Sequence, residues 1–189
     1  MRTGTIRKIS CAVLVAAAVS SCSMLPGSGS GSPEKGDDGR TYQDALDAML
    51  PGVRDAMKPA MPDIEPAEGL RDNADCGGPD LTDGKDASKV KSTFDVDLTG
   101  VASDGRTPQE LASGVVSRLT RQGGWTAGER PDTAPVGKPD GVIKYVDKPG
   151  AGTVMVIAYP FKTTSGAVIP KLSAVIVTDC LRNPKYMKE

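Results

Sequence analysis

The chain has 189 residues with 23 basic and 24 acidic side chains, so its formal net charge at pH 7 is −1. This balance argues against binding to nucleic acid or to acidic lipid, both of which need an excess of basic residues. Histidine is absent, which excludes Ser-His-Asp triads, Cys-His dyads and imidazole metal ligands.

Residues 1–21 have the layout of a secretory signal peptide. Arg2, Arg7 and Lys8 precede an apolar run from Cys11 to Val19, and two small residues follow. A membrane-spanning helix needs about 20 apolar residues, and this run is much shorter. The segment is therefore predicted to direct export and then to be removed.

The end of this segment resembles the lipobox of bacterial lipoproteins, in which an aliphatic residue and two small residues precede a cysteine. The matching residues here are Val19, Ser20, Ser21 and Cys22. In that family the cysteine sulfur receives a diacylglycerol, the signal is then cut immediately in front of that cysteine, and the new amine is usually acylated. The resemblance implies lipid attachment at Cys22 and a location on the extracytoplasmic face of the cell membrane, since several acyl chains anchor stably. The alternative is an ordinary export signal beside an unrelated cysteine.

A flexible tether is predicted for residues 22–40. It is rich in Gly and Ser, cannot bury enough apolar surface to fold, and spans about 25 Å on average. Residues 41–181 are expected to form one domain of usual size, followed by a polar, frayed tail at 182–189. Removing residues 1–21, which hold three basic and no acidic residues, leaves a formal net charge of −4.

The cysteines point to one disulfide. Cys11 leaves with the signal and Cys22 carries the lipid, so Cys76 and Cys180 remain as a pair in an oxidising compartment. Two buried thiols are the alternative. Two cysteines alone do not fill a zinc shell, so no metal or other cofactor is expected.

The first helix is predicted from Thr41, an N-cap that forms a weak capping box with Asp44. Apolar residues follow at helical spacing: Leu46, Met49, Leu50, Val53 and Met57. Pro51 predicts either a kink or two abutting short helices, since it cannot donate to the preceding turn. The methionines favour a core position over a ligand-facing surface.

Residues 59–90 are predicted to form a loop, because three prolines end the first helix and acids are frequent. Residues 80–84 do not match a calcium-binding loop, and turn formation explains the acids equally well.

A strand is predicted from Val90 to Thr99, where apolar residues alternate with Asp95 and Asp97. The two aspartates share one face of that strand. We favour a solvated strand face over a catalytic carboxylate pair.

A second helix is predicted from the capping box of Thr107 and Glu110, with Pro108 in the first helical position. Gly123 and Gly124 end this helix. The only tryptophan, Trp125, comes next. A lone Trp beside a helix end more often fills the core than stacks on a ligand.

Three strands are predicted at residues 141–147, 153–161 and 171–179, which are rich in β-branched residues and separated by Gly-containing turns. They form an antiparallel meander whose middle strand is apolar on both faces. The fold class is therefore α+β, a two-layer domain with helices packed on one face of a mainly antiparallel sheet.

The whole layout resembles the small uncharacterised lipoproteins of actinobacteria. The shared features are a lipobox, a Gly/Ser tether, one α+β domain and one cysteine pair. The resemblance implies a cell-envelope location. The expected function is a non-catalytic binding or accessory module that meets an envelope protein or small ligand, and the alternative is a carboxylate-dependent envelope hydrolase.

Overall fold

The computed structural model describes residues 39–77 and 85–186. The lipobox at residues 19–22, including Cys22, and most of the tether lie outside the described residues. The helices are α1 (Tyr42–Met57) and α2 (Pro108–Arg121), with the 3-10 turns η1 (Lys58–Ala60) and η2 (Pro184–Tyr186). The strands are β1 (Ala67–Gly77), β2 (Lys85–Thr99), β3 (Thr126–Ala127), β4 (Val142–Lys148), β5 (Gly152–Lys162), β6 (Val168–Thr178) and β7 (Leu181–Arg182).

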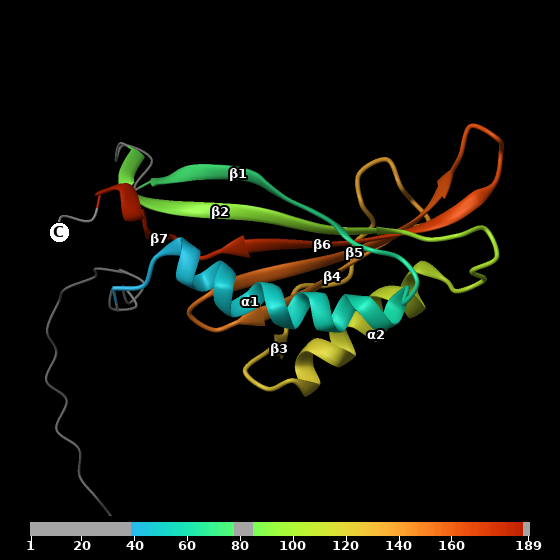
Figure 1. Cartoon of the computed structure of the whole chain (residues 1–189), viewed down its shortest axis with the longest axis horizontal. Helices are drawn as coiled ribbons and strands as arrows, with labels where there is room; N and C mark the ends of the chain where they lie inside the picture. Colours follow the sequence, from blue (N-terminus) through green and yellow to red (C-terminus); the bar gives the residue numbers. More distant parts are fainter. Residues whose placement is uncertain (1–38, 78–84, 187–189) are drawn as a thin grey trace, which may run out of the picture. The chain divides into compact units, whose positions relative to one another are not determined.

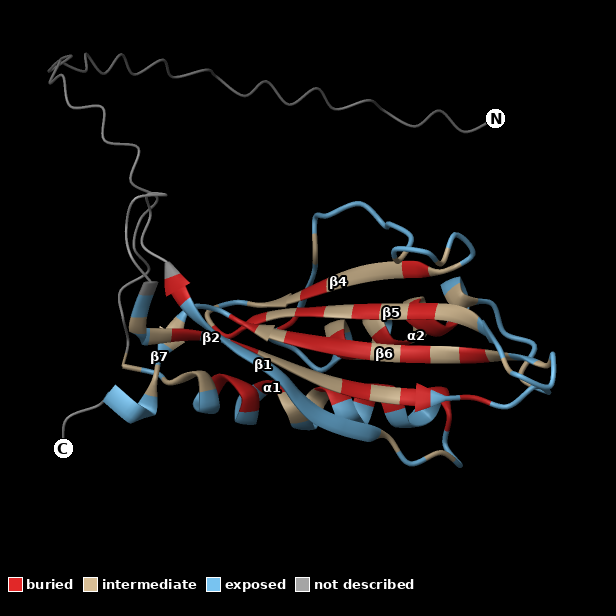
Figure 2. Cartoon of the chain, turned by 90° about the horizontal axis from the view of Figure 1, so that it is seen from above, coloured by how far each residue is buried: buried red, intermediate tan, exposed pale blue. Residues whose placement is uncertain are grey.

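The strands form one sheet in the order β1-β2-β6-β5-β4-β3, and β7 pairs with β2. Every pair of neighbouring strands is antiparallel. Both helices cover the same face of the sheet, below it in Figure 1 and behind it in Figure 2. The predicted α+β two-layer class and the C-terminal meander β4-β5-β6 are confirmed.

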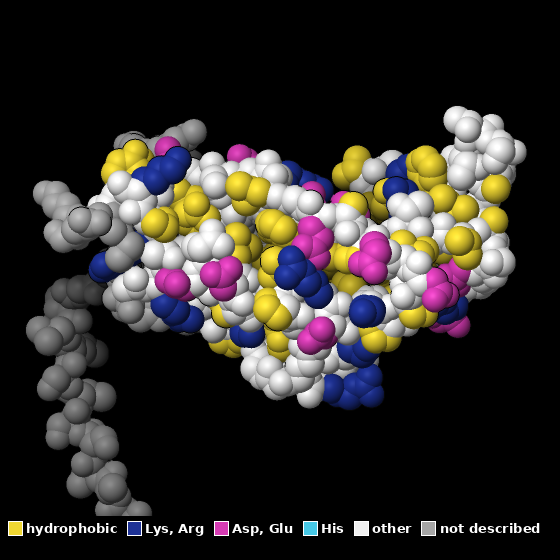
Figure 3. All heavy atoms as spheres, in the orientation of Figure 1, with side chains coloured by type: hydrophobic (Ala, Val, Ile, Leu, Met, Phe, Trp, Pro, Cys, Tyr) yellow, Lys and Arg dark blue, Asp and Glu magenta, His cyan; other side chains and the backbone are white. Residues whose placement is uncertain are grey.

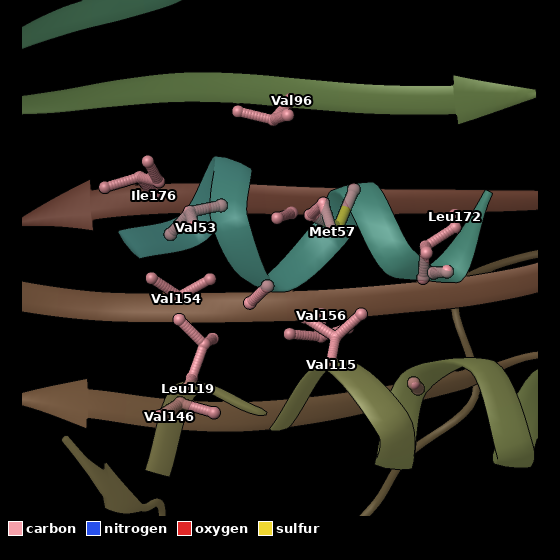
Figure 4. Packing of buried hydrophobic residues seen from close by; sticks show 14 of the residues in the cluster. Val53, Met57, Val96, Val115, Leu119, Val146, Val154, Val156, Leu172 and Ile176 are labelled. Atoms are coloured by element: carbon pink, nitrogen blue, oxygen red, sulfur yellow. The ribbon is translucent and has the colours of Figure 1, made fainter. Parts of the chain in front are cut away.

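The space between helices and sheet is filled by apolar side chains. The side chains of Val53 and Met57 on α1 and of Val115 and Leu119 on α2 point towards the strands (Figure 4). The strands meet them with every second residue: Val96, Val146, Val154, Val156, Leu172 and Ile176. This layer is therefore the hydrophobic core, as period-two alternation requires.

Helix α1 continues through Pro51 as a single helix, so the two abutting short helices, one of the two predicted arrangements, are not seen. Its capping box at Thr41 and Asp44 is complete. Burial of Val53 and Met57 beyond the proline offsets the cost of about 3 kcal/mol for an interior proline.

Helix α2 has the predicted capping box, with Pro108 in its first turn.

Two arginines donate hydrogen bonds to carbonyl groups at the C-terminal end of the α1–η1 segment. Arg118 Nε donates to the carbonyl oxygen of Ala56 at 2.6 Å, and Arg106 donates to that of Ala60 at 2.5 Å. These carbonyls lack partners inside the helix, so the guanidinium groups join the two helical segments.

The predicted loop at 59–90 is wrong in part, because it contains β1 and the first residues of β2. The cause is the place of β1 at the edge of the sheet. The side chains at positions 67–75 are all exposed, so they show no alternation of apolar and polar residues. Two register shifts interrupt its pairing with β2, and bulges and charges of this kind protect an open edge.

The predicted disulfide joins Cys76 to Cys180, with 6.0 Å between the Cα atoms. It ties the end of β1 to the corner between β6 and β7. The predicted frayed tail at 182–189 is wrong for its first residue, since Arg182 pairs with Lys89 of β2. Thr41 forms a bridge with Arg182, so the described chain begins at this same corner.

Candidate functional site

The face of the sheet that turns away from the helices carries the candidate site (Figure 2). Register aligns its side chains in rows across the strands. One row contains Tyr145, Met155, Val175 and Asp95, and the next contains Ile143, Ile157, Ser173 and Asp97. Most of these side chains are half-buried although no second layer of helices covers them.

The loop between β3 and β4, residues 128–141, makes one wall of this site. Cations from the loop lie over tyrosines of the open face: Arg130 over Tyr145 at 4.9 Å and Lys138 over Tyr159 at 5.3 Å from the ring centres. Thr133 pairs with Ile143 at the edge of β4. Cation–π contacts and backbone pairing therefore hold the loop against the sheet.

A tight turn shapes the tip of this wall. Lys138 N donates to the carbonyl oxygen of Pro135 at 2.9 Å, and Gly137 has φ of +70°. This is the third position of a turn that requires positive φ and therefore glycine. The turn leaves Val136 fully exposed and directs Lys138 back over the sheet.

The opposite wall is β1. Arg71 lies at a register shift between Leu70 and Asp72, and its Nε donates to Asp95 Oδ2 at 2.7 Å. The other carboxylate oxygen of Asp95 is buried without a hydrogen-bond partner. The ion pair thus joins the edge strand to the open face and occupies one side of Asp95.

Between these walls lies an open groove of about 590 Å³, within the range of about 300–1,000 Å³ for small-ligand sites. Its floor is mixed in character: Ile157, Tyr159, Ser173, Asp97, Thr99 and Lys171. Pro135, Val136 and Lys138 line the loop side, and Ala67 and Arg71 line the β1 side. The groove therefore combines apolar surface with hydroxyl groups and both signs of charge.

Two ammonium groups in the groove have no carboxylate partner among the described residues. The ion pairs of the described residues, inside and outside the groove, join Arg54 to Glu68, Arg71 to Asp95, Arg106 to Asp104 and Lys144 to Asp132. Lys138 and Lys171 lie instead over the ring of Phe161, at 6.0 and 5.6 Å from its centre. One end of the groove is therefore positively charged and aromatic.

Charge is not segregated elsewhere on the face drawn in Figure 3, where acidic, basic and apolar side chains alternate over α1 and β1. In the described ranges, no group of three or more His, Cys, Asp or Glu side chains is placed to hold a metal ion. No helix of the described residues is long and apolar enough to cross a membrane.

The residues considered from sequence fall in two places. Asp95 and Asp97 share the open face, and of the two Asp97 lines the groove. Trp125 is 6% exposed and belongs to the core, as predicted. Met49 and Met57 are core residues too.

Sequence reasoning missed Lys138, Lys171, Tyr159 and Arg71. The alternation in β5 and β6 places Tyr159 and Lys171 on the face of the sheet that turns away from the core. These two residues could therefore have been found from the sequence pattern. Nothing in the sequence of 128–141 shows that this loop returns over the sheet. Arg71 lies in the strand that was taken for a loop.

Comparisons of the chain with protein-family models, with curated proteins and with solved structures found no match. The groove geometry and the N-terminal sequence therefore carry the functional argument.

Proposed function

We propose that this protein is an exported lipoprotein, anchored to the cell membrane through Cys22, whose single domain is a non-catalytic binding module. The groove on the open sheet face is the observation that carries the binding role. It has the volume of a ligand site, a mixed lining and unpaired charges. The anchor rests on the lipobox at residues 19–22.

The position of the groove within the domain supports this role. The described chain begins beside β7, where Thr41 pairs with Arg182, at the end of the sheet opposite the β5–β6 hairpin (Figure 1). The groove uses Lys171, in the half of β6 nearer that hairpin, and Ser173 at the middle of that strand. The described chain therefore begins away from the groove.

The anchor is tested by membrane fractionation of the Cys22→Ala variant. We expect wild type in the membrane fraction as a processed, acylated protein, detected by mass spectrometry. The variant should lose the acyl groups and the cleavage. Cys11→Ala, inside the expected signal, is the matched control and should behave as wild type. Unprocessed wild type among cytosolic proteins would refute the proposal.

The groove is tested by a ligand screen on the mature chain, with amide chemical shifts as the readout. We expect binders to shift resonances around Ile157 and Ser173. Ser173→Phe should fill the groove and abolish these shifts. Val177→Phe, on the same face of β6 outside the groove, should not. Binders that shift only the resonances of residues outside the groove would contradict the assignment of the groove as the ligand site.

A hydrolase that uses two carboxylates is the second candidate. Asp95 and Asp97 are two residues apart on one strand face, a spacing of about 7 Å, and paired catalytic carboxylates lie about 5–10 Å apart. The ion pair of Asp95 with Arg71 leaves Asp97 as the carboxylate directed to the groove. Hydrolysis of nitrophenyl glycosides that disappears in Asp97→Asn would establish this candidate, and an inactive wild type would remove it for that substrate class.

A further inference from the structure

Resting on the proposed function, we propose that the groove binds a short peptide with both ends free, lying across the strands. The peptide carboxylate lies between Lys138 and Lys171. Its amine faces Asp97 and Glu65, and its apolar side chains pack on Ile157. This assigns a ligand class, a zwitterionic tripeptide or tetrapeptide, to the groove.

Charge is arranged for such a ligand. Lys138 and Lys171 lie on the β5–β6 and loop side, and both ammonium groups lie within 6.0 Å of the Phe161 ring centre. Asp97 on β2 and Glu65, which precedes β1, line the other side. The remaining cation of the groove, Arg71, is already paired with Asp95.

The charges are not satisfied by each other. Lys171 faces Thr99 across the ladder, and Asp97 faces Ser173, so the two charged residues are diagonal neighbours, which lie about 7–8 Å apart. No ion pair joins them in the described structure. A ligand with separated charges pairs with both at once, and a singly charged ligand leaves one side unmatched.

The length of the ligand follows from the sheet spacing. The groove crosses from β5 over β6 and β2 to β1, which at about 4.8 Å per strand is about 14 Å. An extended chain advances about 3.3–3.6 Å per residue. Three or four residues therefore reach from Lys138 on the loop side of the groove to Glu65 on the β1 side, and Lys171 and Asp97 lie between these two ends.

The polar floor favours a peptide over a fatty acid. Ser173, Thr99 and Asp97 line the groove beside Ile157 and Ala67. A hydrocarbon chain would cover these polar groups without hydrogen bonds, which is unfavourable. A peptide backbone supplies donors and acceptors to them while its side chains contact the apolar part.

The experiment is calorimetric titration of the mature chain in detergent with Ala-Leu-Ala-Ala, with its C-terminal amide and with its N-acetyl form. We expect the free tetrapeptide to bind, and each blocked form to bind about two- to fivefold more weakly, as loss of partly exposed ion pairs implies. The Lys138→Gln/Lys171→Gln double variant should bind the acid and the amide equally. Asp97→Asn should bind the free amine and the acetyl form equally.

Lys185→Gln, an exposed lysine in η2 at the other end of the sheet, is the matched control and should keep both preferences. Should the double variant have a lowered melting temperature, the two single lysine variants replace it. The comparison of acid with amide in wild type needs no variant.

Two results overturn the inference and leave the proposed function standing. A doubly blocked peptide that binds as tightly as the free one shows that the charges do not select the ligand. Absence of peptide binding, while screened compounds still shift resonances at Ile157 and Ser173, shows that the groove takes another chemical class. Absence of any groove binder, peptide or other, removes the proposed function as well.

Discussion

Gly52 and Gly114 are interior glycines of the two helices with different surroundings. A Cβ atom added at Gly52 would lie 2.7 Å from Gln122 Oε1 and 3.5 Å from the Trp125 ring. Gln122 Nε2 also donates to the carbonyl oxygen of Gly52 at 3.1 Å. At Gly114 the nearest atom, of the Arg118 guanidinium, is 3.4 Å away. Of these two glycines, only Gly52 lies where another segment, at Gln122 and Trp125, approaches the helix too closely for a larger side chain.

Replacing these glycines by alanine should therefore give different results. Alanine inside a helix is favoured over glycine by about 0.5–1 kcal/mol, so Gly114→Ala should raise the free energy of unfolding by that amount. Gly52→Ala should show no such gain, because Gln122 must move and release its hydrogen bond. Urea denaturation of both variants measures this, and equal gains would contradict the assigned contact.

At the scale of the elements, the β3–β4 loop is held from both faces of β4. On the helix side Lys144 forms an ion pair with Asp132 of the loop. The hydrogen bond from Lys144 is the main cause that lowers the pKa of Asp132, and burial opposes it. On the open side Arg130 lies over Tyr145. The wall of the groove therefore depends on a charged carboxylate.

This predicts that the loop loosens in acid. Because the pKa of Asp132 in the folded state lies below its ordinary value, its stabilisation is present above about pH 4 and is lost as the pH falls through the folded-state pKa. The protection factors of the amides at 129–138, which correct for the pH dependence of intrinsic exchange, should fall below that pH. Asp132→Asn should show the low protection factors already at neutral pH, and wild-type protection factors that do not change in acid would refute the anchor.

The edge strand β1 depends on the disulfide as well as on its ladder. It has exposed side chains on both faces, and the Arg54–Glu68 and Arg71–Asp95 ion pairs are its side-chain ties to α1 and β2. Exposed ion pairs contribute about 0–1 kcal/mol each. The covalent link at Cys76 therefore constrains this strand more strongly than either ion pair does.

Removing Cys76 and Cys180 together as serines should lower the free energy of unfolding by about 2–4 kcal/mol, since the closed loop is long. Amide exchange should rise first in β1. Chemical denaturation and hydrogen exchange test this. Loss of protection spread evenly over all strands would show that β1 is not the dependent element.

At the scale of the molecule, one apolar layer carries the fold. Leu119 on α2 is fully buried between the helices and the strands, and Leu70 on β1 is 55% exposed. Deleting a buried leucine side chain costs about 2–5 kcal/mol, whereas exposed substitutions usually stay within about 0.5 kcal/mol.

Leu119→Ala should therefore destabilise the protein by about 2–5 kcal/mol, and Leu70→Ala, its matched control, should leave the free energy of unfolding nearly unchanged. Thermal denaturation followed by circular dichroism measures both. Similar losses in the two variants would mean that the side chain of Leu70 is covered in solution.

Much of the fold was predictable from local chemistry. Thr107 and Glu110 define the start of α2 because a capping box satisfies backbone donors within four residues. The β-branched runs of β4, β5 and β6 alternate because one face of each meets the core. The pairing of Cys76 with Cys180 could be predicted because Cys11 lies in the expected signal peptide and Cys22 is the expected lipid acceptor.

The remaining features depend on contacts that are distant in the sequence. β1 is a strand because its backbone pairs with β2, and its charged side chains carry no pattern of that pairing. α1 passes through Pro51 because the packing of Val53 and Met57 outweighs the local cost. The groove exists only because residues 128–141 fold back beside Lys171 and Ile157, a meeting of segments that no local pattern encodes.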